Sequence, residues 1–187
     1  MPKYILHGGM TRFDTPSNKD FFKLMADEIP LNGTWLGIYF AREPEDVQKI
    51  FERDIKQLNE AKGDRNDINL VCAEKENLLK QMKQADVIFI SGGNTVQLFE
   101  AMNQHPDMKE HLKLNKTYAG SSAGAQILCR EYVEMNESSG EGFGIIPFSI
   151  VVHHRSPIEE YKIIQSTKNI QKPILKIHET QFVVIEV

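Results

Sequence analysis

Short apolar segments alternate with amphipathic helical segments along most of the chain, and this alternation restricts the fold more than any other feature. The apolar segments at residues 3–6, 35–40, 68–71 and 87–90 are rich in Ile, Leu, Val and aromatic side chains. Strands that are buried on both faces of a sheet have this composition. Strands that alternate with helices are joined by right-handed crossovers and form a mostly parallel sheet. We therefore predict a three-layer α/β fold with a doubly wound sheet and helices on both faces.

The intervening segments carry signals for helices. After Pro44, apolar residues recur at spacings of three and four and form one stripe: Val47, Ile50, Phe51, Ile55 and Leu58. A second helix is predicted after Ser17, which we expect to act as its N-cap. The sequence Ser-Pro-Ile-Glu at residues 156–159 predicts another helix that runs to residue 169, because a capping Ser, a Pro at the first helical position and a Glu at the third favour a helix start.

Length and composition narrow the class of protein. We expect one domain over residues 1–187, because the length is close to that of one domain and no repeat or Ser/Gly/Pro-rich linker divides the chain. The net charge of −4, without a cluster of Lys and Arg, argues against nucleic-acid binding. No apolar stretch approaches the roughly 20 residues of a membrane-spanning helix, and the N-terminus lacks the apolar core of a secretory signal. We expect a cytoplasmic protein without a nucleic-acid or membrane partner, in which Cys72 and Cys129 are free thiols.

The segment after a short strand predicted at 117–119 contains the first candidate site. Residues 120–124 read Gly-Ser-Ser-Ala-Gly and match the pattern G-x-S-x-G. A nucleophilic serine on a sharp strand-to-helix turn needs neighbours without bulk, and this spacing supplies them. We predict Ser122 as the nucleophile, with the N–H of Ala123 as one oxyanion donor and a helix over residues 126–130. The alternative is a helix start of small residues packed against the sheet.

A second glycine turn follows the strand at 87–90. Residues 91–95 read Ser-Gly-Gly-Asn-Thr, and Asn94 and Gln97 are spaced as a capping pair for the next helix. Two glycines before a helix leave backbone N–H groups free to face a ligand, and the helix dipole adds positive potential. An oxyanion hole fits this turn better than a phosphate site, because the loop has no Lys and no G-x-x-x-x-G-K-[ST] pattern. A purely structural turn also remains open, as does an oxyanion role for the third glycine turn, His-Gly-Gly at residues 7–9.

A serine nucleophile needs a base and usually a carboxylate that orients the base. His153 and His154 end the apolar segment at 146–152, at the edge where parallel sheets bind ligands. Because adjacent strand residues face opposite sides, only one of the two histidines can address Ser122. By the same alternation, the side chains of His178 and Glu179 diverge after a strand at 174–177.

The remaining histidines and a metal site are less promising. His105 and His111 lie in a polar helical segment and are expected to be solvated. A metal site that combines His153 and His154 with the later His-Glu pair is disfavoured, because strand neighbours rarely share an ion and no helical His-x-x-x-His occurs. We expect no metal and no cofactor.

The two turns at residues 91–95 and 120–125, taken together, resemble those of the dipeptidase E and cyanophycinase family of serine peptidases. That family has a flavodoxin-like fold in common with class I glutamine amidotransferases. The resemblance therefore implies a class I glutamine amidotransferase-like fold and a single peptidase E-like domain. It extends in specific motifs from about residue 85 to the C-terminus and includes a strand that ends in a histidine and a late strand turn with a glutamate.

The resemblance also implies roles for individual residues. The family's base corresponds to His153 and the third member of its triad to Glu179. The oxyanion donors correspond to the backbone N–H groups of Gly93 and Ala123. The implied activity is hydrolysis of short peptides through a Ser-His-Glu triad and an acyl-enzyme, by a monomer or a homodimer.

Substrate contacts are implied for Gly92, Asn94 and Arg155. Arg155 begins the stretch in which aspartyl dipeptidases hold a substrate carboxylate, but Glu159 and Glu160 in the same stretch oppose an acidic substrate.

The sequence leaves two other functions open. One is a catalytically silent amidotransferase-like domain that binds a small ligand or a partner. The other is a glutaminase, which normally has Cys in the elbow; here Cys129 is expected two helical turns beyond the serine.

Overall fold

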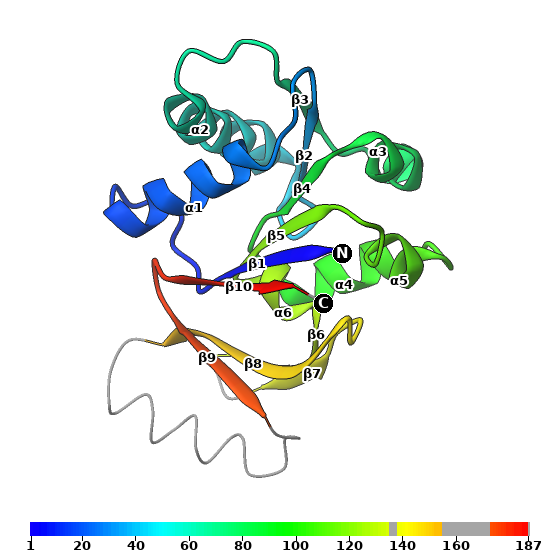
Figure 1. Cartoon of the computed structure of the whole chain (residues 1–187). Helices are drawn as coiled ribbons and strands as arrows, with labels where there is room; N and C mark the ends of the chain where they lie inside the picture. The colour runs from blue at the N-terminus through cyan, green and yellow to red at the C-terminus, as the bar shows by residue number, and fades with distance from the viewer. Residues whose placement is uncertain (135–137, 155–172, 187) are drawn as a thin grey trace.

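The computed structural model describes residues 1–134, 138–154 and 173–186, and Figure 1 shows the chain as a ribbon. The larger sheet has six strands in the order β10-β1-β5-β4-β2-β3. The strands span β1 (Lys3–His7), β2 (Thr34–Ile38), β3 (Asn69–Cys72), β4 (Val87–Ile90), β5 (Thr117–Ser121) and β10 (Phe182–Glu186). The first five pair in parallel, and β10 pairs antiparallel to β1. The predicted mostly parallel sheet is confirmed, with one antiparallel edge strand.

Helices cover both faces of this sheet, as Figure 1 shows. The helices span α1 (Pro16–Asp27), α2 (Pro44–Lys62), α3 (Leu78–Gln84), α4 (Thr95–Asn103), α5 (Met108–His111) and α6 (Ala123–Gln126), and a 3-10 turn, η1, spans Lys75–Asn77. Helices α1 and α2 pack on one face, and α3 to α6 pack on the other. Alternate residues of β4 separate the two layers, since Phe89 faces α1 and α2 whereas Ile88 and Ile90 face the opposite layer.

The starts of the first two helices follow from proline. Pro16 and Pro44 occupy the first turns of α1 and α2, where a missing backbone N–H costs nothing. The predicted cap of α1 is wrong by two residues. Thr15 is the N-cap, and its Oγ1 accepts a hydrogen bond from the N–H of Asn18 at 3.2 Å, whereas Ser17 lies inside the helix. Because Pro16 fixes the helical φ at the first position, the capping residue has to precede it.

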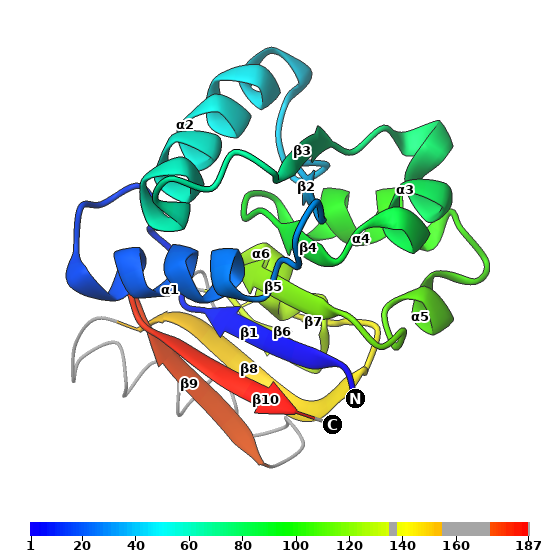
Figure 2. The ribbon, with the colours of Figure 1, turned by 45° about the horizontal axis from the view of Figure 1, so that its top comes forward.

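A second sheet, in the order β7-β6-β8-β9, was not predicted. Its strands are β6 (Cys129–Val133), β7 (Ser139–Glu141), β8 (Ile146–His154) and β9 (Ile174–His178). Strands β6, β8 and β9 pair in parallel, and β7 pairs antiparallel to β6. Figures 1 and 2 show this sheet beyond the β1 and β10 side of the larger sheet. The segments at 146–152 and 174–177 are therefore strands, as predicted, but they belong to a separate sheet.

The helix predicted over residues 126–130 is also wrong. Helix α6 ends at Gln126, and Cys129 begins β6. The pairing of β6 with β8 and the burial of Cys129 and Tyr132 in the main core favour a strand over the weak helical preference of this segment. The helix predicted from residue 156 lies outside the described residues.

None of the described helices combines the length and apolar character that a membrane crossing requires.

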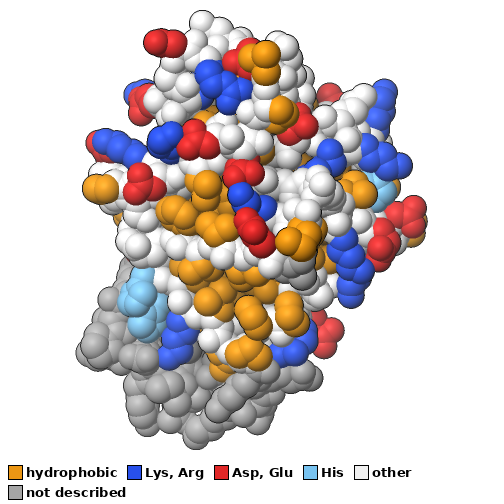
Figure 3. All heavy atoms as spheres, viewed as in Figure 1, with side chains coloured by type: hydrophobic (Ala, Val, Ile, Leu, Met, Phe, Trp, Pro, Cys, Tyr) orange, Lys and Arg blue, Asp and Glu red, His pale blue; other side chains and the backbone are white. Residues whose placement is uncertain are grey.

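On the face shown in Figure 3, hydrophobic side chains gather across the middle of the molecule. The edge strand β10 contributes Val184 to the surface, where its side chain is 45% exposed. This strand pairs antiparallel to β1 and forms the edge of the larger sheet, and β9, the preceding strand in the chain, is an edge of the second sheet.

Phe89 tests the packing between the sheet and the first two helices. Its ring is fully buried and lies 5.6 Å from Trp35 and 6.2 Å from Phe21, centroid to centroid. We expect Phe89→Ala to lower the free energy of unfolding by about 3–5 kcal/mol, because it leaves a cavity among aromatic rings. Phe13, which is 45% exposed, offers a matched control: Phe13→Ala should change stability by less than about 0.5 kcal/mol. Urea titration of both variants makes the comparison, and equal losses would contradict this account of the core.

Candidate active site

Ser122 lies on a sharp turn between β5 and α6. Its backbone has φ 52° and ψ −113°, a strained conformation for a residue with a side chain. Glycines make this turn sterically possible. A methyl group at Gly120 would overlap the backbone of Gly124, and one at Gly124 would overlap the Ile90 carbonyl of β4. The N–H of Ser122 donates to the carbonyl of His7 at 3.0 Å, which ties the turn to the end of β1.

His153 approaches Ser122 from the end of β8. The Nε2 atom of His153 is 2.7 Å from the Oγ of Ser122. His153 has φ 59°, and the pairing register between β8 and β9 shifts between Val151 and His154. Such an irregularity turns a side chain away from the regular alternation of the strand. The backbone N–H of His153 donates to the carbonyl of Gly8 at 2.9 Å and so fixes the displaced backbone.

Glu179 completes a chain of three side chains. Its Oε1 lies 2.9 Å from the Nδ1 of His153, in the turn between β9 and β10. A carboxylate accepts the Nδ1–H, so the lone pair of Nε2 faces the hydroxyl of Ser122. The side chains of His153 and Glu179 are 20% and 16% exposed. The next residue, Thr180, also has a positive φ, 61°, and its N–H donates to the carbonyl of Gly9 at 3.0 Å.

The glycine turn after β1 supports the base and the acid. The N–H of Gly8 donates to the carbonyl of Gln181 at 2.9 Å, and the N–H of Gly9 donates to the Nδ1 of His7 at 3.0 Å. Both donors therefore have protein acceptors, and the oxyanion role considered for this turn does not hold. Gly9 instead lies against the ring of His153, where any side chain would overlap the imidazole.

The turn at residues 91–95 places Gly92 and Gly93 beside Ser122. A methyl group at Gly92 would contact the side chain of Ser122, and Gly93, at φ 149°, packs against the carbonyl of Ala41. The hydrogen bonds of the described turns leave the N–H groups of Gly93 and Ala123 unpaired. These are the two N–H groups that the family resemblance implies as oxyanion donors.

Asn94 caps α4 as predicted. Its Oδ1 accepts a hydrogen bond from the N–H of Gln97 at 3.1 Å. The reciprocal half of the capping box is absent, because the side chain of Gln97 donates to the carbonyl of Arg42 at 3.3 Å instead. Arg155, the third residue expected to contact substrate, lies outside the described residues.

Three arginines beside Ser122 were missed by the sequence analysis. Arg12, Arg42 and Arg53 line the same cavity as Ser122 and His153, with a volume of about 210 Å³. Arg12 and Arg42 follow the carboxyl ends of β1 and β2, so a search of all loops at this edge of the sheet could have found them. Arg53 lies on the charged α2, where nothing in the sequence distinguishes it.

A buried acid holds Arg53 in place. Its guanidinium contacts the fully buried carboxyl of Asp54, with Nη2 2.7 Å from Oδ1. Burial raises the pKa of Asp54, and the charge of Arg53 opposes that shift. The hydroxyl of Tyr39 also donates to Asp54, at 3.2 Å. The position of Arg53 at the cavity is therefore fixed from the core side.

The other histidines diverge from the triad. His154 and His178 pack against each other with ring centroids 4.3 Å apart, so the side chains of His178 and Glu179 do point apart as predicted. Within the described ranges, no group of three or more His, Cys, Asp or Glu side chains could hold a metal ion. His111 is only 8% exposed, and its Nδ1 lies 2.9 Å from the carbonyl of Asp107, so the expectation that it is solvated is wrong.

Cys129 does not support a glutaminase. The thiol is fully buried in β6, and burial raises its pKa to about 12. A thiol with such a pKa forms almost no thiolate near neutral pH.

His7 gives a test of how the turn after β1 is built. The N–H of Gly9 can only donate, so Nδ1 of His7 is unprotonated, and Nε2–H faces the Oδ1 of Asn18 at 2.8 Å. Asn18 in turn donates to the carbonyls of Met10 at 2.9 Å and Phe13 at 2.8 Å. Burial lowers the pKa of His7 from 6.5 to about 4. Neutral His7 therefore anchors the loop that follows β1.

Stability should depend on pH through His7. Between about pH 6.5 and 4 the unfolded chain protonates this residue while the folded one keeps it neutral, so the unfolded state binds more protons. The stabilising contribution is complete above pH 6.5 and falls by about 3 kcal/mol as the pH drops to 4. Denaturant titrations across this range measure the loss, and His7→Gln should flatten it. An unchanged slope in the variant, or an NMR midpoint of His7 near 6.5, would contradict the assignment.

Comparisons with known proteins place the chain in a family. Peptidase E of Shewanella denitrificans is 29% identical over 90 residues, which are 43% of this chain and 38% of that protein. The matched part is thus well under two thirds of the relative's length. The crystal structure of a peptidase from an acI-B1 Actinobacterium has a TM-score of 0.70 at 18% identity and covers 99% of this chain and 83% of its own.

A second solved structure shows the same fold. A protein of Listeria monocytogenes EGD-e assigned to peptidase E has a TM-score of 0.66 at 15% identity, over 100% of this chain and 99% of its own. These likenesses confirm the three-layer α/β fold. The sequence profile of peptidase family S51 matches residues 4–186. The resemblance to the dipeptidase E family is thereby confirmed, and the chain belongs to peptidase family S51.

Proposed function

We propose that this protein is a serine peptidase that hydrolyses short peptides through Ser122, His153 and Glu179. The observation that carries the proposal is the linear arrangement of the three side chains, with 2.7 Å from Oγ to Nε2 and 2.9 Å from Nδ1 to Oε1. Both distances lie within hydrogen-bond range, as a nucleophile, a base and an orienting acid require. Membership of a peptidase family gives the arrangement its reaction class.

The reaction follows from the directions of the hydrogen bonds. His153 takes the proton of Ser122 as Oγ forms a bond to the substrate carbonyl carbon, and Glu179 stabilises the resulting imidazolium. The oxyanion is stabilised by the N–H groups of Gly93 and Ala123. The bond from carbon to the amide nitrogen then breaks, and His153 gives its proton to the leaving amine. Water, deprotonated by His153, releases the acid product and restores Ser122.

The surroundings of the triad have supporting roles in this proposal. Gly92 lies against Ser122 in the turn before α4, and we assign Gly92 and Asn94 of this turn to substrate contact together with Arg155. Residues 1–187 act as a single peptidase domain, since the triad combines β5 of the larger sheet with β8 and the β9–β10 turn. We further propose that the enzyme works in the cytoplasm as a monomer or homodimer, with a short peptide as its only partner and no cofactor.

Covalent labelling tests the proposed chemistry. A fluorophosphonate should label Ser122 in the folded protein, and Ser122→Ala should abolish labelling. Loss of one triad member costs on the order of 10⁴ to 10⁶ in rate, so His153→Gln and Glu179→Gln should nearly abolish both labelling and peptide hydrolysis. His154→Gln is the matched control and should retain labelling, because His154 packs on His178 and not on Ser122. Absence of labelling in the folded wild-type protein would refute the proposal.

Gly9 tests the support of the base. Gly9→Ala should displace the imidazole, since its methyl group would overlap the ring of His153. A shift of about 1 Å at a reacting group can cost about 100-fold in rate, and we expect a loss of that size in kcat/KM. Gly63→Ala is the control, because Gly63 also has a positive φ, 62°, but has no neighbour within 4 Å. It should lose stability without losing activity, and equal activity losses in the two variants would count against the role of Gly9.

A further inference from the structure

Two cavities of opposite charge meet at Ser122. The first, the arginine cavity, has a volume of about 210 Å³ and is lined by Arg12, Arg42 and Arg53 together with Ser122. The second, the glutamate cavity, has a volume of about 300 Å³ and is lined by Glu134, Gln126 and Thr95, again with Ser122. Gly93 and His153 also line both. The reacting hydroxyl therefore separates a cationic side from an acidic side.

The arginine cavity has unbalanced positive charge. Asp54 neutralises Arg53 from the core side, and the Nε of Arg42 is buried without a hydrogen-bond partner among the described residues. Burial, followed by the charge of Arg53, lowers the pKa of the Arg42 guanidinium. A partly buried guanidinium with an unpaired donor beside other cations is stabilised by an anion. A carboxylate suits this cavity, because it binds guanidinium through paired hydrogen bonds.

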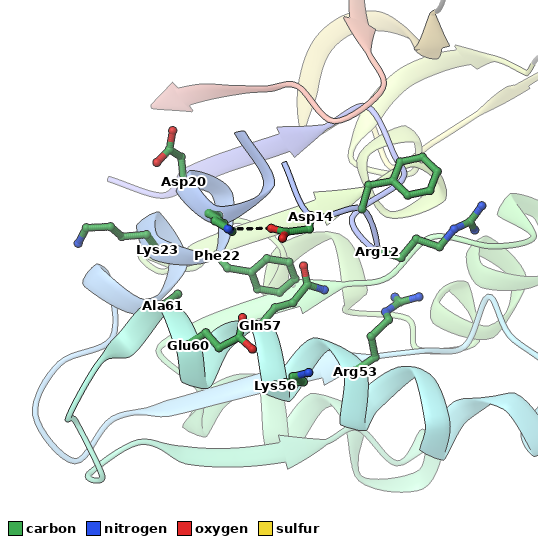
Figure 4. A pocket seen from close by; sticks show the side chains of 12 residues that line it. Arg12, Asp14, Asp20, Phe22, Lys23, Arg53, Lys56, Gln57, Glu60 and Ala61 are labelled. Atoms are coloured by element: carbon green, nitrogen blue, oxygen red, sulfur yellow. Dashed lines mark ion pairs between the residues drawn. The ribbon is translucent and has the colours of Figure 1, made fainter. Parts of the chain in front are cut away.

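The arginine cavity adjoins a larger groove between α1 and α2, shown in Figure 4. This groove has a volume of about 620 Å³, and Arg12 and Arg53 line it as well as the arginine cavity. In Figure 4 these two side chains lie at one end of the groove, and Lys23 and Asp20 lie at the other. A ligand that starts at Ser122 can thus continue past the arginines along the two helices.

The lining of the groove leaves two cations for an acidic chain. Its cationic side chains are Arg12, Lys19, Lys23, Arg53 and Lys56, and its acidic ones are Asp14, Asp20 and Glu60. Ion pairs join Lys19 to Asp14 and Lys23 to Asp27, each at 2.8 Å, and Arg53 to Asp54 at 2.7 Å. Among the described residues, Arg12 and Lys56 are therefore the groove cations without an ion pair. The Nε2 of Gln57 is buried there without a hydrogen-bond partner among the described residues and can donate to a ligand carbonyl.

The charges at the two ends of a peptide set its direction. A free peptide carries an ammonium group at one end and a carboxylate at the other. The ammonium group fits the glutamate cavity near Glu134, and acidic side chains of the carboxyl-terminal part fit the arginine cavity. The arginine cavity alone is smaller than the roughly 300–1,000 Å³ usual for ligand pockets. The groove brings the carboxyl-terminal side into that range, so it has room for several residues at about 3.3–3.6 Å of chain per residue.

We propose that the substrate is an acidic peptide longer than two residues, cleaved near its amino terminus, whose carboxyl-terminal part runs over Arg12, Arg42 and Arg53 into the groove between α1 and α2. This inference rests on the proposed peptidase function. Ser122 Oγ bonds to the carbonyl carbon of the amino-terminal part, and the bond from that carbon to the amide nitrogen breaks. The nitrogen takes a proton from His153 and leaves with the acidic fragment, after which water hydrolyses the ester.

Matched peptides test the charge and the length of the substrate. The probes are Ala-Ala-Glu-Glu-Glu, its uncharged counterpart Ala-Ala-Gln-Gln-Gln, and the dipeptide Ala-Ala. Charge-assisted hydrogen bonds are stronger than neutral ones, so kcat/KM for the Glu peptide should exceed that for the Gln peptide at least tenfold. The preference should shrink at high salt, and the dipeptide should be the poorest substrate. Mass spectrometry should find the three Glu residues together in the released fragment.

Single-charge variants locate the recognition. Arg42→Gln should reduce the preference for the Glu peptide about tenfold, and the exposed Arg12→Gln and Lys56→Gln should reduce it severalfold. Lys80→Gln is the control, because this substitution removes the same charge from an exposed residue of α3, on the opposite face of the sheet. It should leave the preference unchanged. An equal effect of Lys80→Gln and Arg12→Gln would overturn the inference, since general charge and not the groove would then explain the preference.

Labelling and binding separate this inference from the proposed function. If fluorophosphonate labels Ser122 but the Glu and Gln peptides are cleaved equally, the peptidase function stands and the inference falls. Cleavage between Glu residues would also overturn it. If Ser122 fails to label and no peptide is cleaved, the peptidase function falls. Calorimetry with Ser122→Ala then decides on recognition alone: tighter binding of the Glu peptide than of the Gln peptide supports the groove, and equal binding refutes it.

Discussion

The insertion of Gly8 and Gly9 between two distant segments is the interaction on which the site depends. The carbonyl of Gly8 accepts the N–H of His153, and the carbonyl of Gly9 accepts the N–H of Thr180, next to the acid of the triad. The N–H of Gly8 donates to the carbonyl of Gln181, so the turn after β1 contacts the described chain on both sides of residues 155–172. Only residues without side chains allow this approach, because a methyl group on either glycine would overlap its neighbours. The end of β1 thereby holds His153 and Glu179, the proposed base and acid, together.

Backbone strain is concentrated where the catalytic groups lie. Among the described residues, five other than glycine have positive φ, and Ser122, His153 and Thr180 are three of them. Each such conformation costs on the order of 1 kcal/mol or more and persists only where neighbouring bonds enforce it. Here the enforcing bonds run to His7, Gly8 and Gly9 respectively, all at the end of β1. Neutral, buried His7 extends this support through Asn18 to the loop that carries Arg12.

The sequence predicted the parts of this protein that depend on local pattern, and it failed where long-range pairing decides. Glycines and a capping Asn identify the turns at 91–95 and 120–124 because sterics alone require those residue types there. His153 and Glu179 could be placed at strand ends, but their roles rested on a family resemblance. No local signal predicts the second sheet, because the apolar residues of β8 fit either sheet. Nor does any local signal predict the positive φ of His153, which a hydrogen bond to Gly8 sustains. Arg53 was missed because its orientation depends on a buried partner, Asp54.

The proposed catalytic groups and the proposed recognition groups come from different parts of the fold. The base and the acid come from the second sheet and its return to β10, whereas Arg12, Arg42 and Arg53 come from the first two strand ends and α2. The Gly8–Gly9 turn touches both, through the triad on one side and the loop to Arg12 on the other. The turn at 91–95 also touches both, since Gly92 lies against Ser122 and Gly93 against Ala41, next to Arg42. The groove between α1 and α2 can therefore change its charge and width without moving Ser122, His153 or Glu179. In the proposed recognition, one triad geometry can serve substrates that differ in length and charge, because Ser122, His153 and Glu179 are not part of the lining of the groove.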